Sequence, residues 1–291
     1  ADPSGKIDIP MLMIDDEADN ASINTSKSKE DPTKINKLIR ELASVFTKSN
    51  YVGFTATPFA NVFIDPETTE KMETQDLFPE DFIVALPTPS NYIGANQIFA
   101  KDGKYHSQLT YITDAGREEL DGYPFYFKHT KEWADELPDS LTDAIYAFYI
   151  VNAIRDLRGD HTEHRSMLVN ISRFVAVQKY IKEIIDDIHK RAYRSIKYNL
   201  SDAEECMKDP VLKRIYYVWE KYYSFVEFSW EKIANAMFAA IENIQIKVVN
   251  SSKSSEKLEY PKNDSLRVIA IGGLALSRGL TLEGLVVSYF Y

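Results

Sequence analysis

Apolar and polar positions alternate along the first part of the chain in blocks that predict a strand, a helix and a second strand. Residues 7–14 form a short apolar run, which is typical of a fully buried strand. Residues 51–55 form a second such run, which Pro58 interrupts. Between them, residues 35–47 carry apolar side chains at helical spacing. These are Ile35, Leu38, Ile39, Leu42 and Phe46. The order predicts a βαβ unit with a parallel sheet.

The second half of the chain repeats this alternation on a larger scale. Residues 139–158 predict a long helix that Asp139 or Ser140 caps and Gly159 ends. Further apolar runs predict strands at 167–171, 267–271 and 284–291, and helical spacing predicts helices at 175–198, 211–225 and 229–249. We therefore expect a second α/β unit that carries an inserted helical bundle at about residues 199–262.

Residues 65–138 have a different character, because Pro and Gly recur and the pattern predicts short strands, such as Phe82 to Leu86, that alternate with turns. This pattern predicts an irregular α+β insertion. The expected fold class is thus α/β, with two parallel-sheet lobes of which the first is partial. The predicted domains are residues 1–64, 65–138 and 139–291. Since the last strand, "GLVVSYFY", has no turn after it, we expect the chain to be a fragment of a longer polypeptide.

Composition and charge limit the partners and the cell compartment that we expect for the protein. The formal net charge of −10 argues against a surface that coats nucleic acid non-specifically. The charged stretch Lys179 to Lys197 mixes both signs, and we interpret it as a solvated helix face rather than a binding patch. Cys206 is the single cysteine, so no disulfide forms within the chain. No signal peptide or membrane span is visible, and we expect a cytoplasmic protein without membrane contact.

Candidate chemistry starts at "MLMIDDEADNASINT", where an apolar strand runs into Asp15, Asp16, Glu17 and Asp19. Four neighbouring carboxylates need a metal, a basic partner or water to offset their repulsion. Nucleoside triphosphatases use such a strand end: an Asp holds Mg²⁺, usually through water, and a Glu positions the attacking water. This pattern predicts Asp16 as the Mg²⁺ residue and Glu17 as the catalytic residue. An exposed acidic turn is the alternative.

Three further segments resemble motifs of superfamily-two helicases, in the same order along the chain. "GFTATPFAN" resembles motif III, which implies that the hydroxyls of Thr55 and Thr57 contact Asp19 and couple ATP state to lobe movement. "SMLVNISRF" stands in the place of motif IV, where Asn170, Ser172 and Arg173 are weak candidates for nucleic-acid contact. "LALSRGLTLEGL" resembles motif V, which implies nucleotide or inter-lobe contacts by three residues. These are Arg278, Gly279 and Thr281, the last standing where an acidic residue is common.

Taken together with "FPEDFIVALPTPSNYIGA" and "SLTDAIYAFYIVNAIRDLRG", these segments resemble the helicase-associated Z-one family over nearly the whole chain. The resemblance implies a superfamily-two ATPase core of two RecA-like lobes that uses ATP and Mg²⁺ in the full-length protein and moves along DNA. It also implies a bacterial restriction or phage-defence setting, beside a GHKL-type ATPase and nuclease components. The family carries an endonuclease label that is itself a prediction.

Two expected motifs are missing. No G-x-x-x-x-G-K-[ST] phosphate loop is present, since Gly5-Lys6 and Gly103-Lys104 precede Ile7 and Tyr105 rather than a hydroxyl residue. The arginine-bearing motif VI that would follow motif V is also absent. Without them a triphosphate lacks its cradle of backbone amides, and the transition state lacks an arginine worth roughly 10³- to 10⁵-fold in rate. We therefore expect no measurable ATP hydrolysis by this chain.

Two other functions stay open at this stage. A metal-dependent endonuclease would use the same four carboxylates, from Asp15 to Asp19, as metal ligands. Against it, the sequence has no convincing Asp…Glu-x-Lys arrangement. A non-catalytic scaffold would dock a partner through the aromatic helices between Val211 and Val249, although core packing explains those aromatic residues equally well.

Overall fold

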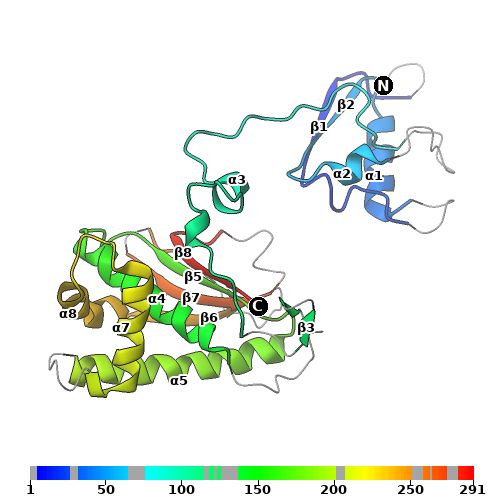
Figure 1. Cartoon of the computed structure of the whole chain (residues 1–291). Helices are drawn as coiled ribbons and strands as arrows, with labels where there is room; N and C mark the ends of the chain where they lie inside the picture. Colours follow the sequence, from blue (N-terminus) through cyan, green and yellow to red (C-terminus); the bar gives the residue numbers. More distant parts are fainter. Residues whose placement is uncertain are drawn as a thin grey trace. The chain divides into compact units, whose positions relative to one another are not determined.

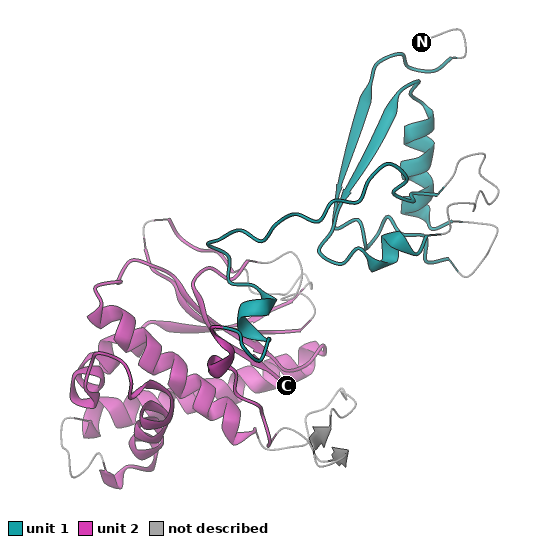
Figure 2. Ribbon diagram, turned by 45° about the horizontal axis from the view of Figure 1, so that its top comes forward, with its two compact units in different colours: residues 1–103 teal, residues 104–291 magenta. Residues whose placement is uncertain are grey.

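The computed structural model describes residues 5–26, 32–64, 76–114, 118–120, 123–125, 137–200, 207–250, 258–262, 264–273 and 281–291. The chain forms two compact units, residues 1–103 and 104–291 (Figure 2). Both contain parallel strands together with helices, so the α/β class is confirmed. The domain boundaries expected at residues 64 and 138 stay predictions. Within the described ranges, none of the helices has the length and apolar composition needed to cross a bilayer.

The first unit is built on the predicted βαβ arrangement (Figure 1). Strand β1 (Met11–Asp16) pairs in parallel with β2 (Ser49–Phe54), and helix α1 (Lys34–Ser44) connects them. Two short helices follow, α2 (Phe59–Val62) and α3 (Ala95–Ile98). The short strand expected at Phe82 to Leu86 is wrong, because these residues form no strand and are exposed. No strand among the described residues pairs with this segment.

Burial in the first unit differs from the expectation. Strand β1 alternates between half-buried and exposed positions, and the side chains of Leu12 and Ile14 are 61% and 63% exposed. The prediction of a fully buried strand is therefore wrong. The side chains that α1 buries are polar, namely Asn36 and Arg40, whereas its apolar residue Leu38 is 53% exposed. The reason is that Asn36 donates to the carbonyl of Ser22 (2.9 Å), which turns the polar face inward.

The second unit holds a four-stranded parallel sheet in the order β6-β7-β5-β8. Its strands are β5 (Arg165–Asn170), β6 (Ile244–Val249), β7 (Arg267–Gly272) and β8 (Leu285–Phe290). The two central strands, β5 and β7, are almost entirely buried, as expected for a parallel sheet covered on both faces. The strands predicted at 167–171, 267–271 and the end of the chain are confirmed within one or two residues.

Among the described residues, four helices cover one face of this sheet. They are α4 (Asp139–Leu157), α5 (Val175–Asn199), α7 (Pro210–Tyr223) and α8 (Trp230–Ile241). Alternate strand residues such as Val169, Ile271 and Tyr289 point into a core shared with these helices. The intervening residues Leu168 and Ala270 face the other way and pack with a small separate cluster. Tyr216, Trp219 and Trp230 contact one another beside this core and serve packing, whereas Tyr217 of α7 is 47% exposed.

One predicted helix is partly wrong. The helix expected at 229–249 ends at Ile241, and strand β6 follows from Ile244. The physical reason is visible in Ile244, Ile246 and Val248, whose β-branched side chains alternate at period two and reach the sheet core. The helical insertion is therefore shorter than expected at its carboxyl end. The remaining described elements are a 3₁₀ turn (His106–Gln108) and a small antiparallel pair, β3 (Glu118–Leu120) and β4 (Tyr123–Phe125).

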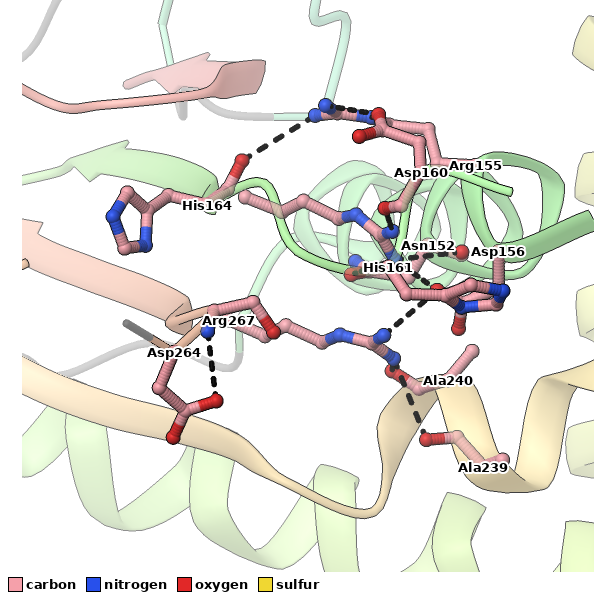
Figure 3. A network of polar contacts seen from close by, with 12 residues as sticks. Asn152, Arg155, Asp156, Asp160, His161, His164, Ala239, Ala240, Asp264 and Arg267 are labelled. Atoms are coloured by element: carbon pink, nitrogen blue, oxygen red, sulfur yellow. Dashed lines mark hydrogen bonds and ion pairs between the residues drawn. The ribbon is translucent and has the colours of Figure 1, made fainter. Parts of the chain in front are cut away.

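A buried ion network fastens the end of α4 to the amino ends of β5 and β7 (Figure 3). One carboxylate oxygen of Asp156 receives Arg165 at 2.8 Å and Arg267 at 2.7 Å, with His161 at 3.3 Å. Arg165 is fully buried, and this burial lowers the pKa of its guanidinium despite the partner carboxylate. Arg165 also donates to the carbonyls of Asn152 and Asp160. Because Arg165 and Arg267 are the first residues of β5 and β7, the network fixes the start of both strands relative to α4.

A second ion pair gives a direct titration test. Arg158 donates to both carboxylate oxygens of Glu227, at 2.6 and 2.8 Å, and this pairing lowers the pKa of Glu227 to about 2. Since the folded pKa is depressed, the stabilisation is present above the ordinary pKa of 4.5 and disappears as the pH falls towards 2. NMR titration of the Glu227 carboxyl carbon should show this low midpoint. In Arg158→Met the midpoint should return close to 4.5. An unchanged midpoint in that variant would contradict the pairing.

Candidate functional site

The carboxylates and the threonines of the sequence prediction lie at one edge of the first unit's sheet. Because β1 and β2 are parallel and paired to their last residues, Asp16 opposite Phe54, the two chains leave the sheet side by side. The backbone N–H of Ala18 donates to the carbonyl of Phe54 (3.0 Å) and extends the pairing beyond the strand. Ligands of open α/β sheets bind at this carboxyl edge.

Asp19 is held by both threonines at this edge. Thr55 Oγ1 donates to Asp19 Oδ1 at 2.8 Å, and Thr57 Oγ1 donates to Asp19 Oδ2 at 2.6 Å. The backbone N–H of Thr57 donates in turn to Thr55 Oγ1 (2.9 Å). The contact implied by the helicase resemblance is therefore present. The coupling role of these three residues stays a prediction. Through these hydrogen bonds the segment after β2 contacts the carboxylate turn directly.

Asp16 and Glu17 remain open to solvent at the start of this turn. Glu17 has a φ of 59°, a left-handed backbone conformation that non-glycine residues rarely adopt. Its N–H donates to Asp16 Oδ1 (3.1 Å), and its carbonyl accepts from Asn20 (2.9 Å). These contacts fix the backbone at Glu17 while both carboxylates stay accessible. Such strain at an accessible acidic residue is typical of functional sites.

Asp15, which has no assigned role in the sequence prediction, has a half-buried hydrogen-bond partner. The phenol of Tyr51 donates to Asp15 Oδ2 at 2.5 Å across the two strands. Burial and this hydrogen bond together raise the pKa of Tyr51 well above its ordinary value. Tyr51 therefore stays protonated and keeps donating over the physiological range. Of the four carboxylates, Asp15 and Asp19 are thus engaged by protein hydroxyls, and Asp16 and Glu17 are the exposed pair.

Three residues that the sequence reasoning missed shape the turn around Ala18. Asn61 and Ser22 both donate to the carbonyl of Ala18, at 2.9 and 3.0 Å. Gly53 allows Ala18 to pack against β2, because a Cβ at Gly53 would lie 2.7 Å from the Cβ of Ala18. Ala18 is accordingly buried, with 1% of its surface exposed. A glycine within an otherwise apolar strand was the available signal, since it often marks a close approach of another backbone.

The motif IV candidates lie where β5 leaves the sheet of the second unit. Ser172 is buried, and its hydroxyl accepts from the N–H of Phe174 (3.2 Å), which shapes the turn into α5. The carbonyl of Asn170 accepts from the N–H of Tyr291 (3.0 Å), and its side chain is half-buried. Arg173 is exposed, with its guanidinium 5.0 Å from the Phe174 ring. Of the three, Arg173 is thus the side chain that a phosphate reaches most easily.

Motif V is only partly visible. Arg278 and Gly279 lie outside the described residues, and Thr281 is exposed just before β8. The preceding residue of interest is Gly273, where an added Cβ would lie 2.7 Å from the carbonyl oxygen of Ser172. The segments after β5 and β7 therefore come close together at the carboxyl edge of this sheet. The motif IV and motif V roles themselves stay predictions.

The exposed carboxylates fit only one mode of Mg²⁺ binding. In the described ranges, no three His, Cys, Asp or Glu side chains gather closely enough to form a metal cage. Mg²⁺, however, usually keeps several waters and takes one or two carboxylates together with substrate phosphates. Asp16 at the end of β1 has the oxygen ligands for that mode. A cage made from all four carboxylates does not fit, because Tyr51, Thr55 and Thr57 already engage two of them.

Comparison with known proteins gives one match. A family model described as Z1 domain matches residues 140–291, just over half of the chain. This region starts in α4 and includes the whole four-stranded sheet of the second unit. The carboxylate turn lies outside it. No curated protein and no solved structure matches the chain.

Proposed function

The chain belongs to the Z1 domain family, and on that premise we propose that it forms part of an ATP-dependent motor that moves along DNA. In this proposal residues 1–64 and 139–291 belong to the two RecA-like lobes of a superfamily-two helicase-like core, the first of them partial, and residues 65–138 form an accessory region. Asp16 would hold Mg²⁺ through water, and Glu17 would position the water that attacks the γ-phosphate. The bound ATP supplies the phosphoryl group, and Mg²⁺ would neutralise the charge that develops on it.

The observation that carries the proposal is the double hydrogen bond from Thr55 and Thr57 to Asp19. These hydrogen bonds connect the carboxylate turn to the segment that follows β2. Asp19, which accepts them, lies two residues after the exposed Glu17. A change in the position of Glu17 when ATP binds would be passed to that segment through Asp19. A merely exposed acidic turn would not need a buried Ala18 or two donors on one side chain.

The endonuclease alternative is less well supported by the same geometry. A metal-dependent nuclease site built on this segment would need several carboxylates free to bind metal. Asp15 is instead paired with Tyr51 and Asp19 with Thr55 and Thr57. The scaffold alternative is also less well supported, because most aromatic residues of α7 and α8 pack against the core and do not form a free docking surface. The defence setting, with a GHKL-type ATPase and nuclease components as partners, is proposed on the family resemblance alone.

We predict that the 291-residue chain hydrolyses no ATP above background but binds a divalent ion with ATP at Asp16. Because the phosphate loop is missing, this binding should be weak and should require a high concentration of ATP. Mn²⁺, used as a paramagnetic substitute for Mg²⁺, should broaden the backbone NMR signals of residues 16–19 when ATP is added. The effect should disappear in Asp16→Ala and persist in the control Asp81→Ala, which removes an exposed carboxylate of the same unit that lies outside the carboxylate turn in the sequence.

Two outcomes would reject this proposal. Equal broadening in wild type and Asp16→Ala would show that the ion does not use the turn. Cleavage of plasmid DNA with Mg²⁺ or Mn²⁺ that is lost in Asp16→Ala would establish the endonuclease instead. ATP turnover that Glu17→Gln abolishes would contradict only the expectation that the chain is inactive by itself.

A further inference from the structure

Helix α5 separates its charges along its length. Between Val175 and Asp187 it carries two lysines and three acidic residues, whereas from Ile188 to Asn199 it carries four cations and no acidic residue. The four cations are Lys190, Arg191, Arg194 and Lys197, and all four are exposed. The sequence analysis interpreted the whole stretch as one solvated mixed face. The carboxyl-terminal half is instead a basic surface on a protein of net charge −10.

Aromatic side chains are interleaved with these cations. Tyr198 is 68% exposed, and the ammonium of Lys197 lies 5.6 Å from its ring centre. The same ammonium lies 5.9 Å from the ring of Tyr193, which packs against Phe238 of α8. Tyr193 is therefore fixed by the core, and Lys197 is positioned between two rings. Preordered cations beside an exposed ring lose less conformational entropy when they bind a ligand.

These residues line an open hollow of about 280 Å³ on the helix surface. Its lining consists of His189, Lys190, Tyr193, Arg194, Lys197 and Tyr198. His189 forms the inner wall, since its Nδ1 is hydrogen-bonded to the hydroxyl of Tyr149 (2.8 Å) and burial lowers the pKa of its imidazole. The positive charge of the hollow thus comes from the lysines and Arg194. The ammonium of Lys190 lies 3.7 Å from the exposed carboxylate of Asp187.

We propose that this hollow on α5 binds a single strand of nucleic acid, with phosphates on Lys190, Arg194 and Lys197 and a base stacked on Tyr198. Residues 190 to 197 span about 10 Å of helix, roughly three nucleotides at ~3.4 Å each. Basic grooves with exposed aromatic rings are the common solution for single-strand binding. An acidic peptide would match the cations but gives no reason for an exposed tyrosine beside them.

This surface is separate from the predicted motif IV contacts. Arg173 lies two residues before α5, and the hollow begins at His189, about 21 Å along the helix axis from Val175. A motor that holds DNA at the carboxyl edge of its sheets would use α5 as a second contact for a displaced strand. The inference rests on the proposed function in that the ligand is the same DNA, but its test requires neither ATP nor Mg²⁺.

The test measures binding of the full chain to a fluorescent oligothymidine of about 20 nucleotides by anisotropy, across a salt series. The triple variant Lys190→Gln/Arg194→Gln/Lys197→Gln should weaken binding more than tenfold near 50 mM salt. The slope of log K against log salt concentration should become less steep by about 2, because each of the three lost phosphate contacts contributes ~0.7. The control Lys213→Gln/Lys232→Gln/Lys262→Gln makes the same charge change at exposed positions elsewhere in the second unit and should weaken binding less than about twofold.

A second pair of variants tests the stacking. Tyr198→Ala should weaken binding roughly fivefold or more, whereas Tyr198→Phe, which keeps the ring, should retain it. Equal losses in the two triple variants would overturn the proposal, because they would show a general charge effect. Absence of binding by the wild-type chain would also overturn it, and would leave an acidic protein as the ligand to test. Neither result touches the Mn²⁺ and ATP experiment, so failure here is distinguishable from failure of the proposed function.

Discussion

Asp156→Asn should destabilise the second unit by about 3–5 kcal/mol, the usual cost of removing one partner of a buried ion pair. In the wild-type chain one oxygen of Asp156 receives both Arg165 and Arg267. The guanidinium of Arg165 has no exposure to solvent, so water cannot replace the lost charge. An amide at position 156 still accepts hydrogen bonds but leaves two cations close together without a counter-charge.

Thermal and denaturant unfolding, followed by circular dichroism, should show this effect as a loss of about 10 °C in Tm. The matched control is Asp187→Asn, which removes the exposed partner of Lys190 at 3.7 Å. That variant should change stability by less than ~0.5 kcal/mol, since exposed ion pairs contribute little. If the two variants lost equal stability, the network of Figure 3 would not be the element that fastens α4 to the sheet.

Gly53→Ala should loosen the carboxylate turn, with a cost of about 1–3 kcal/mol from overpacking. The new methyl group would lie 2.7 Å from the Cβ of Ala18, which is buried against β2. Ala18 would have to move, and with it the carbonyl that accepts from Asn61 and Ser22. The hydrogen bonds from Thr55 and Thr57 to Asp19 lie directly beyond and should weaken as a result.

Amide hydrogen exchange measures this locally. Residues 16–19 should exchange roughly 5- to 150-fold faster in Gly53→Ala, which is the same free energy expressed as a rate ratio. The control is the double variant Ala18→Gly/Gly53→Ala, which exchanges the two side chains and removes the overlap. A double-mutant cycle should then show a favourable coupling. Purely additive effects would mean that Gly53 is needed for a reason other than its contact with Ala18.

Much of the order of elements could be predicted from the sequence. The βαβ start, the long helix at 139–157, the helix at 175–199 and the strands around Met167 and Ile269 all follow from local periodicity, which depends on neighbouring residues alone. The contact of Asp19 with Thr55 and Thr57 was expected only from the resemblance to helicase motif III. The structure supplies its geometric reason, because two parallel strands that end together bring their following residues to one edge.

Burial was less accessible, because it depends on which layers cover a given face. The apolar residues Leu12 and Leu38 are exposed while Asn36 and Arg40 are buried, and no local pattern distinguishes these cases. Strand β6 was mistaken for helix because the apolar run that contains it continues from α8 without a proline or glycine. Whether such a run extends or turns depends on a sheet edge being available to it, which is a long-range condition.

The sequence by itself determined the residue types at the candidate site, their order along the chain and the family to which the carboxyl-terminal half belongs. The tertiary structure decided which of the four carboxylates are engaged and which are exposed, that Asp156 joins two distant arginines, and that one half of α5 is a basic surface. The physical reason is range. Periodicity and capping act over a few residues, whereas hydrogen bonds, desolvation and charge depend on groups that only folding brings together.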